Sequence, residues 1–370
     1  LSDKRKSNKI RCFFMIELKE DSIIFSINNN DVYDLPFLWF RDNCQCDECR
    51  ITETQEKQFL LNTVPLSIKP VKASETEDSF LITWEDSHQT IIPFEVINNS
   101  IQSRYPKHQS WPKNFIPKKI DWDSFLNEKD IALDGLKEFI KHGVIILKNA
   151  PKEPETLEKL SIRLGPIHET LFERIHNVSV TGHVYNVAHT SKGLPPHNDF
   201  ASYTSQPSVQ ALHMLENECE GGESVIVDGW ELVEDFREDH SDYFETLCKF
   251  EVPFREFDQE NETYAEAPLI KCSSDGSIES FRYSNQLMQM ISPSKKGIKE
   301  FYKAYHELST RVFDSKYRST FRLHGGEVLI VASLRVLHAR ESFIPNGKRH
   351  LQDAYFVYDN AANNVVLLSN

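Results

Sequence analysis

The amino-acid sequence predicts a mainly β protein with flanking helices, made of a jelly roll that follows a smaller β-rich module. From about residue 178 onward, short runs of alternating or branched apolar residues dominate, and only two long charged segments have helical spacing. A proline-containing stretch divides this part of the chain from earlier strand-like runs. Many short strands with few helices favour a barrel or jelly roll, because such folds close off the exposed edges of their sheets.

Residues 15–104 form the predicted N-terminal module. It opens with three strand-like runs that are rich in branched and aromatic side chains, MIELKE, SIIFSI and DLPFLWF, and a cysteine cluster follows at once. Two further runs, FLITWED and QTIIPFEVI, come later in this segment. We therefore expect a small β domain.

Residues 105–118 contain three prolines and no hydrophobic periodicity, which is typical of a stiff linker. Residues 119–370 form the second predicted domain. Its first part contains a helix, SFLNEKDIALDGLKEFIKHG, a buried strand, VIILKN, and a second amphipathic helix, EPETLEKLSIRLG. Strands dominate the remainder, with two charged helices, ELVEDFREDHSDYFETLCKF and KKGIKEFYKAYHELSTRVFD, between them.

The composition limits the classes of partner. The chain has 370 residues and a formal net charge of −14, which opposes binding to a polyanion, and it has no basic stripe interleaved with aromatic residues. No apolar run approaches the roughly 20 residues that span a bilayer, and the N-terminal stretch lacks the apolar core of a secretory signal. We expect a soluble, cytoplasmic protein that binds neither nucleic acid nor membrane; organelle targeting by the basic N-terminal stretch stays open.

Three of the seven cysteines, Cys44, Cys46 and Cys49, lie within six residues. Thiolates so close together repel one another unless a cation holds them, and a tetrahedral zinc site with three cysteines and one histidine is a common solution. We predict His88 as the fourth ligand. An iron–sulfur cluster, for which only Cys12 is near as a fourth thiolate, and simple free thiols are the alternatives.

A second candidate metal site begins at His197 and Asp199. On a strand, residues two apart project to the same face, so this pair can direct an imidazole and a carboxylate at one point. His338, which ends an apolar strand, is the best candidate for a third ligand. Two histidines and a carboxylate are the ligand set of non-haem Fe(II) oxygenases. Another His-x-Asp pair, His240 and Asp242, lies in a charged helical stretch where the two side chains diverge, so we interpret it as a solvated surface.

Arg349 strengthens the iron hypothesis. An Fe(II) oxygenase needs two further electrons to split dioxygen, and oxidative decarboxylation of a bound 2-oxo acid can supply them. The far carboxylate of such a cosubstrate needs a fixed cation, and a guanidinium can bind it in a bidentate manner. Arg349 follows His338 within the strand-like run RHLQDAYFVYD, where it could serve this purpose.

The runs PPHNDF, VQALHML, GGESVIVDGW, RVLHARESF and RHLQDAYFVYD resemble those of the 2-oxoglutarate-dependent dioxygenases of the taurine dioxygenase and γ-butyrobetaine hydroxylase group. LWFRDNC with its spaced cysteines, followed by ITWEDSH, resembles the small zinc-binding domain of γ-butyrobetaine and trimethyllysine hydroxylases, which taurine dioxygenase lacks. The resemblance implies a double-stranded β-helix (jelly-roll) catalytic domain that binds Fe(II) and 2-oxoglutarate. It also implies a structural Zn(II) domain, a homodimer, and ascorbate as a candidate reductant.

The resemblance also carries over individual residues. It implies His197, Asp199 and His338 as iron ligands, and it implies that Arg349, Asn186 and Leu212 contact the cosubstrate. Arg340 lies two residues beyond His338 on the same face of the strand, where it could help to orient the cosubstrate. Ordinary barrel packing is the alternative for Asn186 and Leu212, and a turn residue is the alternative for the implied substrate contact Asn285. The aromatic cage for a trimethylammonium group is replaced at matching positions by Phe172, His176, His189 and Phe200. Because histidines are poorer faces for a cation, this departure argues against γ-butyrobetaine as the substrate.

The sequence thus predicts an oxygenase that hydroxylates an unactivated C–H bond of a small amino acid or amine-bearing carboxylate and releases succinate and CO2. Desaturation and ring closure use the same ligands and stay open. Halogenation is disfavoured, because related halogenases lack the carboxylate that Asp199 supplies here. The alternatives are a γ-butyrobetaine or trimethyllysine hydroxylase with a divergent cage, and a non-catalytic protein that senses iron and 2-oxoglutarate.

Overall fold

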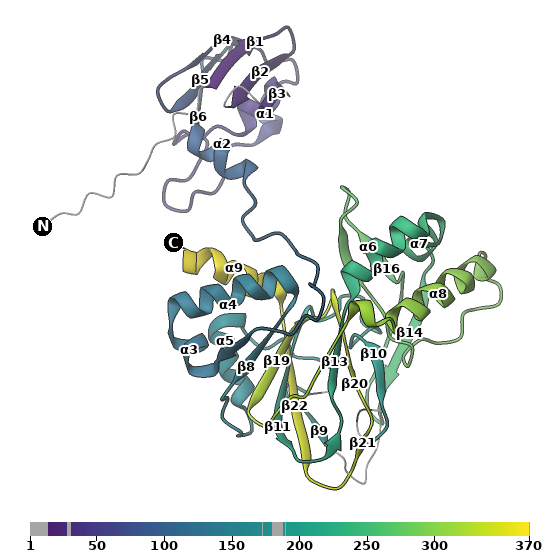
Figure 1. Cartoon of the computed structure of the whole chain (residues 1–370). Helices are drawn as coiled ribbons and strands as arrows, with labels where there is room; N and C mark the ends of the chain where they lie inside the picture. The colour runs from purple at the N-terminus through teal and green to yellow at the C-terminus, as the bar shows by residue number, and fades with distance from the viewer. Residues whose placement is uncertain (1–13, 28–30, 172, 180–187, 189, 370) are drawn as a thin grey trace, which may run out of the picture. The chain divides into compact units, whose positions relative to one another are not determined.

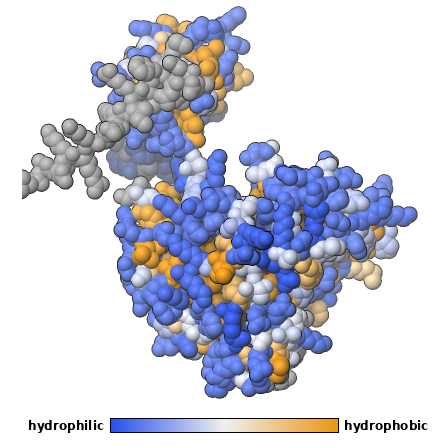
Figure 2. Space-filling model, in the orientation of Figure 1, coloured by the Kyte–Doolittle hydropathy of each residue, from blue (hydrophilic) through white to orange (hydrophobic). Residues whose placement is uncertain are grey.

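The structure is a computed structural model that describes residues 14–27, 31–171, 173–179, 188 and 190–369. The chain separates into two compact units, Leu1–Ser103 and Arg104–Asn370 (Figure 1). Hydrophilic side chains cover most of the described surface on the face drawn in Figure 2. Within the described residues, the helices are all too short or too polar to cross a bilayer.

The first unit contains two three-stranded antiparallel sheets. One has the order β1 (Phe14–Leu18), β2 (Ser22–Ile27), β3 (Asp31–Pro36), and the other β4 (Pro70–Glu75), β5 (Ser79–Trp84), β6 (Gln89–Pro93). The remaining elements are helices α1 (Phe37–Asp42) and α2 (Phe94–Ile101) and a 3-10 turn, η1 (Leu61–Thr63). Aromatic side chains fill the core: the ring centroid of Phe25 lies 5.2 Å from that of Phe80 and 6.0 Å from that of Phe40.

The run DLPFLWF is not a single strand, contrary to the prediction. β3 ends at Pro36, and the apolar residues after it form α1. Pro36 is extended, with φ −65° and ψ 152°, and a proline both ends strand pairing and favours the start of a helix. QTIIPFEVI divides in the same way at Pro93. A short, wholly apolar run does not by itself distinguish a strand from a buried helix, which is why the pattern misled.

The second unit is built on two main sheets. The larger has the order β7 (Lys119–Asp121), β8 (Val144–Lys148), β19 (Glu327–Ala332), β11 (Val209–Asn217), β22 (Arg349–Phe356), β9 (His176–Ser179). The smaller has the order β10 (Leu194–His197), β20 (Val336–Arg340), β13 (Ser224–Asp228), β18 (Arg318–Phe321). Three two-stranded ribbons are β12 (Glu220–Gly221) with β21 (Phe343–Ile344), β14 (Val252–Phe257) with β15 (Glu262–Ala267), and β16 (Ile270–Cys272) with β17 (Ile278–Phe281).

Alternating side chains give the larger sheet two apolar faces. On β19, Val328 and Ile330 pack in the cluster that contains the helices, whereas Leu329 and Val331 belong to the cluster that includes Ile226 of the smaller sheet. Period-two alternation therefore places one face under helices and the other towards the smaller sheet, as in a jelly roll. The covering helices are α3 (Trp122–Asn127), α4 (Lys129–His142), α5 (Ser161–Leu164) with the 3-10 turn η2 (Thr156–Leu160), and α9 (Tyr358–Ser369) (Figure 1).

Three of the four predicted helices do not form one continuous α-helix. The first is divided at Glu128 into α3 and α4, and EPETLEKLSIRLG forms a 3-10 turn and a single helical turn. The first charged segment forms α6 (Gly229–Asp239) and α7 (Ser241–Lys249) with a break at His240, and the second forms α8 (Ile298–Val312) before the 3-10 turn η4 (Ser315–Tyr317). These helices enclose a separate apolar cluster with β14, β16 and β17.

Residues 105–118 contain no helix or strand and pack within the second unit. The rings of Trp111 and Phe115 stack with centroids 4.6 Å apart, and Trp111 Nε1 donates to the carbonyl of His142 at 2.8 Å. Arg335 donates to the carbonyl of Gln109 at 2.7 Å. These contacts fix the stretch to the second unit.

Candidate active site

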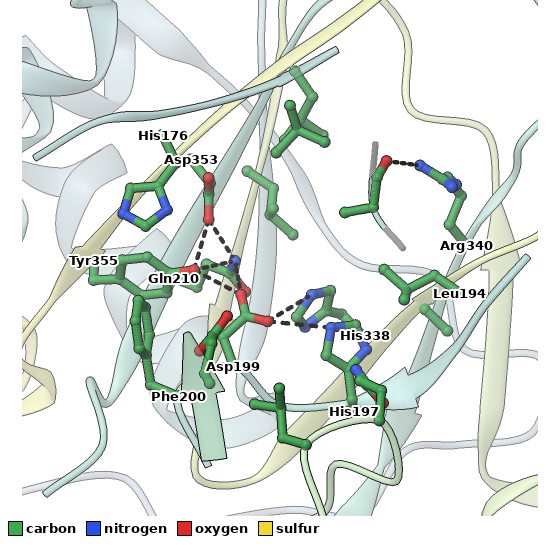
Figure 3. Close-up of a pocket in the computed structure, with 18 of the residues that line it drawn as sticks. His176, Leu194, His197, Asp199, Phe200, Gln210, His338, Arg340, Asp353 and Tyr355 are labelled. Atoms are coloured by element: carbon green, nitrogen blue, oxygen red, sulfur yellow. Dashed lines mark hydrogen bonds and ion pairs between the residues drawn. The ribbon is translucent and has the colours of Figure 1, made fainter. Parts of the chain in front are cut away.

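Strand pairing brings the three predicted iron ligands together. His197 at the end of β10 is paired directly with His338 on β20, and Asp199 follows two residues after His197. Asp199 Oδ1 lies 3.1 Å from His197 Nε2 and 3.9 Å from His338 Nε2, and the two imidazole centroids are 4.2 Å apart (Figure 3). The three donor atoms therefore converge on one point.

The turn that carries the first two ligands is fixed by the residue between them. Asn198 is fully buried; its amide nitrogen donates to the carbonyls of Phe281 and Ser333, and its Oδ1 accepts from the backbone N–H of Tyr283 at 3.0 Å. His197 Nδ1 lies 2.9 Å from the carbonyl of Pro195. With the ring hydrogen on Nδ1, the free lone pair is on Nε2, the nitrogen that faces Asp199.

A polar network holds the other oxygen of Asp199. Oδ2 accepts hydrogen bonds from Gln210 Nε2 and from Tyr355 Oη, each at 2.6 Å. Burial opposes ionisation of Asp199, but the charges of His338 and His197 and the hydrogen bond from Tyr355 hold its pKa well below its usual range. Burial and the neighbouring His197 lower the pKa of His338 to about 4. The cluster thus combines a carboxylate with a neutral imidazole.

This donor set fits a ferrous ion. Bonds of about 2.1 Å in an octahedral ion place neighbouring ligand atoms about 3 Å apart. The distance from Asp199 Oδ1 to His197 Nε2, 3.1 Å, matches this value, and the distance to His338 Nε2, 3.9 Å, is longer. Two imidazole nitrogens and one carboxylate oxygen occupy one face and leave the opposite positions for other ligands. The three side chains would hold the ion through His197 Nε2, His338 Nε2 and Asp199 Oδ1.

A cavity of about 390 Å³ adjoins the cluster and is lined by residues from both main sheets. Arg349 lies in its wall, with the guanidinium carbon 5.2 Å from the ring centroid of Phe343. The Arg349 guanidinium forms no hydrogen bond or ion pair with any described residue, and its Nε is buried without a partner. Burial lowers the pKa of Arg349. A half-buried cation without an anion is a site for a carboxylate ligand.

The structure also places the other predicted residues of the catalytic unit. Leu212, His176, Phe200 and Arg340 line the same cavity. Arg340 donates to the carbonyls of Ala188, Thr190 and Lys192 at 2.9, 2.7 and 2.8 Å, so most of its donors hold a loop rather than face the cavity.

One predicted substrate residue is not in the cavity wall, and three predictions fall outside the described residues. Asn285 is exposed, accepts from Tyr305 Oη at 3.2 Å, and is not in the cavity wall, whereas its neighbour Gln286 is. Phe172, Asn186 and His189 lie outside the described residues.

Four polar lining residues that the sequence did not predict matter for the site: Gln210, Asp353, Tyr355 and Glu256. Three of these four carried a signal in the sequence. Arg349, Leu351, Asp353 and Tyr355 alternate along β22 and all line the cavity, so once Arg349 was placed inside, period two indicated the others. Gln210 lies two residues before Leu212 on β11 and follows the same rule. Glu256, on the ribbon strand β14, had no comparable signal.

The first unit brings together the other predicted ligand set. His88 Nε2 lies 3.4 Å from Cys44 Sγ, 3.9 Å from Cys46 Sγ and 3.6 Å from Cys49 Sγ. Tetrahedral zinc, with bonds of about 2.3 Å to sulfur and about 2.0 Å to nitrogen, places such atoms about 3.5 Å apart. The carboxylate of Glu48 lies 3.5 Å from His88 Nδ1, as is common behind a zinc-bound histidine. The donors fit a tetrahedral zinc ion.

The thiols differ in acidity. Burial opposes ionisation of Cys44, yet the backbone N–H of Cys46 and the imidazole of His88 lower its pKa to about 7. Burial and the neighbouring Cys44 charge raise the pKa of Cys49 to about 12. Three thiolates therefore need a compensating cation.

The jelly roll, the convergent triad and the unpaired arginine define a class of protein, the Fe(II)- and 2-oxoglutarate-dependent oxygenases. Residues 106–355 match the sequence model of the family described as taurine catabolism dioxygenase TauD, TfdA family, and the chain belongs to this family. Residues 16–97 match the family described as gamma-butyrobetaine hydroxylase-like, N-terminal. These matches confirm the resemblance noted from the sequence motifs.

Curated relatives match over nearly the full chain. The gamma-butyrobetaine dioxygenase of Pseudomonas sp. (strain AK-1) is 28% identical over 343 residues, which are 90% of this chain and 89% of the relative. The trimethyllysine dioxygenase of Bos taurus is 24% identical over 355 residues, covering 92% and 84%. A solved structure from Burkholderia xenovorans, proposed to be an alpha-ketoglutarate-dependent taurine dioxygenase, is similar with a TM-score of 0.50, at 14% identity over 71% of this chain and 98% of that chain. That likeness supports the fold.

Proposed function

We propose that this oxygenase hydroxylates a C–H bond of a small amine-bearing carboxylate, with His197, Asp199 and His338 as the iron ligands. The observation that carries the proposal is the unpaired guanidinium of Arg349 in the cavity that adjoins the triad. A cavity of about 390 Å³ suits 2-oxoglutarate together with a small substrate.

Each side chain has a distinct task in this proposal. Bound iron and 2-oxoglutarate supply the oxidising chemistry, with decarboxylation of the cosubstrate to succinate and CO2. Arg349 binds the far carboxylate of 2-oxoglutarate and so fixes which end faces the triad. Gln210 and Tyr355 hold Asp199 Oδ2, which leaves Oδ1 directed towards the two imidazoles. Apolar side chains such as Leu212 and Phe200 exclude water from the reacting carbon.

Turnover of γ-butyrobetaine or trimethyllysine is the second candidate function, because the relatives with those names match over nearly the whole chain. Such substrates need aromatic faces around a trimethylammonium group. Among the described cage positions, Phe200 is aromatic, whereas His176 is a weaker face for a cation. We therefore rank this function below the first.

Succinate formation tests the proposal. The purified chain, with Fe(II) and 2-oxoglutarate, is given a panel of amino acids and amine-bearing carboxylates that includes γ-butyrobetaine and trimethyllysine. We expect one amine-bearing compound to increase succinate release strongly. A product that gains one oxygen indicates hydroxylation, and one that loses two hydrogens indicates desaturation or ring closure. Tight 2-oxoglutarate binding without succinate release for any compound would contradict the proposal and favour a sensing role.

For the first unit, we propose a structural zinc ion on Cys44, Cys46, Cys49 and His88, and a homodimer that this unit supports. The separations between the sulfur and nitrogen atoms support the zinc ligands. Metal analysis of the purified chain, expected to give one zinc per chain, tests the first point. Light scattering tests the second, and a monomer mass would contradict it.

A further inference from the structure

The network behind Asp199 has too few hydrogens for its contacts. Tyr355 Oη lies 2.6 Å from Asp199 Oδ2 and 2.7 Å from Asp353 Oδ2, but a hydroxyl has a single hydrogen. Gln210 Nε2 lies 2.6 Å and 2.9 Å from the same two oxygens and can donate to both. Three hydrogens therefore serve four contacts between these two donors and the two carboxylates.

Among the described residues, no donor reaches the other oxygen of Asp353. Asp353 is 4% exposed and lies in the cavity wall, and its Oδ1 is buried without a hydrogen-bond partner among the described residues. An added proton on Oδ2 would complete the network but would still leave Oδ1 as an acceptor. A buried acceptor without a donor is costly, so a donor from a ligand is expected at this position.

The nearest histidine does not supply that donor. His176 is the cross-strand neighbour of Asp353 and lies beside it in Figure 3. Its Nε2 lies 2.9 Å from the carbonyl of Glu173 and 3.1 Å from the hydroxyl of Thr170, and no ion pair joins its ring to Asp353. The imidazole is therefore engaged with its own loop.

A second carboxylate comes from a separate element. Glu256 on β14 lines the same cavity, and its side chain forms no hydrogen bond or ion pair with the described residues. Its carboxylate feels the charge of Asp199, which together with burial opposes ionisation unless a cation is near. The cavity thus has two acidic groups from different strands in addition to the triad.

A basic and an acidic side chain lie well apart along the cavity wall. Arg349 and Asp353 are four residues apart on one face of β22, which separates their Cα atoms by about 13 Å at about 3.3 Å per residue. The arginine end suits the cosubstrate carboxylate. The aspartate end suits a cation with N–H donors.

We propose that Asp353 and Glu256 bind an ammonium group that retains N–H bonds, so that the substrate is a primary or secondary amine rather than a trimethylammonium compound. The inference rests on the proposed function in that this amine belongs to the molecule oxidised at the triad. A trimethylammonium group has the charge but no hydrogen to donate to Asp353 Oδ1. Its methyl groups also keep the charge away from both carboxylates.

Binding measurements on one carbon skeleton test the proposal. The full chain, with Mn(II) in place of iron and with 2-oxoglutarate, is titrated calorimetrically with 4-aminobutyrate and its N-methyl, N,N-dimethyl and N,N,N-trimethyl forms. Lysine and N6-trimethyllysine provide a longer skeleton. Because a hydrogen bond to a charged group is worth about ten-fold or more in affinity, we expect the trimethyl form to bind at least about ten-fold more weakly than the primary amine. Equal or tighter binding of both trimethyl forms, or no binding of any amine, would overturn the proposal.

Two variants and a matched control assign the effect to the residues. Asp353→Asn and Glu256→Gln each remove one charge, and each should reduce the preference for the primary amine by about ten-fold. Glu260→Gln removes an equal charge from an exposed position just after β14 and should leave the preference unchanged. Because Asp353 belongs to a network, Glu256→Gln keeps the test decisive if Asp353→Asn misfolds. If Glu256→Gln preferred the primary amine over the trimethyl form as strongly as the parent protein does, the role of Glu256 would be overturned.

Succinate formation separates this inference from the proposed function. Faster turnover of a trimethyl form than of its primary amine would leave the oxygenase in place and overturn the ammonium site. Tighter binding of the primary amines than of the trimethyl forms, without any succinate formation, would support the ammonium site and contradict the oxygenase.

Discussion

The two clusters of candidate metal ligands differ in how completely their donors surround the ion. In the first unit, three sulfurs lie 3.4–3.9 Å from the nitrogen of His88, which completes a tetrahedron. In the second unit, three donors occupy one side, and a cavity of about 390 Å³ lies on the other. Closed sites stabilise a fold, whereas open sites admit reactants. The comparison supports the proposal that one site serves structure and the other serves chemistry.

The largest expected effect is at the open site. Asp199→Ala removes the only carboxylate of the triad, so succinate formation coupled to Fe(II) should fall to background. Circular dichroism should still report a folded protein, because Asp199 is not part of an apolar cluster. Asp242→Ala changes the second His-x-Asp pair at its aspartate, which is exposed on α7, and should retain activity. An active Asp199→Ala protein would contradict the ligand assignment.

The closed site should respond through stability. Structural zinc in small domains contributes about 10 kcal/mol of binding free energy to folding, so Cys44→Ser should release zinc and unfold the first unit. Metal analysis of the full chain measures the loss of zinc, and the rate of proteolytic cleavage within residues 1–103 measures the unfolding. Cys248→Ser, outside the cluster, should keep its zinc. If Cys44→Ser retained full zinc content and protease resistance, the comparison between the two sites would fail.

Loss of the Arg349 guanidinium should weaken the binding of 2-oxoglutarate selectively. Arg349→Gln should raise the KM for 2-oxoglutarate by about 100-fold, because a charge-assisted bidentate contact is replaced by a neutral one. Arg318→Gln removes an arginine that is paired with Glu341 at the surface, and its KM should stay within about two-fold of the parent value. An unchanged KM in Arg349→Gln would place the cosubstrate carboxylate elsewhere.

The smallest expected effect comes from removing a hydrogen bond to Asp199. Tyr355→Phe removes one of the two donors to Asp199 Oδ2 and leaves Gln210 in place. Groups that orient a metal ligand typically contribute 10- to 100-fold to affinity, so we expect about ten-fold weaker Fe(II) binding in an anaerobic titration. Tyr305→Phe serves as the control, because the hydroxyl that it removes donates to Asn285 and not to Asp199. Iron affinity equal to the parent in Tyr355→Phe would assign the tyrosine to another task.

The candidate iron ligands could be predicted from the sequence because strand periodicity is local. His197 and Asp199 are two residues apart, and His338 ends an apolar run, so side-chain alternation alone suggested a common target. The pairing of His197 with His338 then follows from the antiparallel register of β10 and β20. The family motifs added the cosubstrate and the fold.

The network around Asp199 could not be predicted in the same way. Gln210 and Tyr355 meet Asp199 only because β11 lies beside β22 in the sheet, a pairing between segments about 140 residues apart. Asn285 lies in a turn after β17, where no periodicity fixes which residue faces the cavity, and its neighbour Gln286 does so instead. Local pattern indicates facing residues within a strand but not the partner of that strand.

An anaerobic crystal structure of the full chain with Fe(II) and 2-oxoglutarate tests the central claim most directly. Anomalous scattering at the iron edge should give one peak bonded to His197, Asp199 and His338, with 2-oxoglutarate extending from it to the guanidinium of Arg349. An iron peak elsewhere, or a cosubstrate carboxylate without contact to Arg349, would contradict the account.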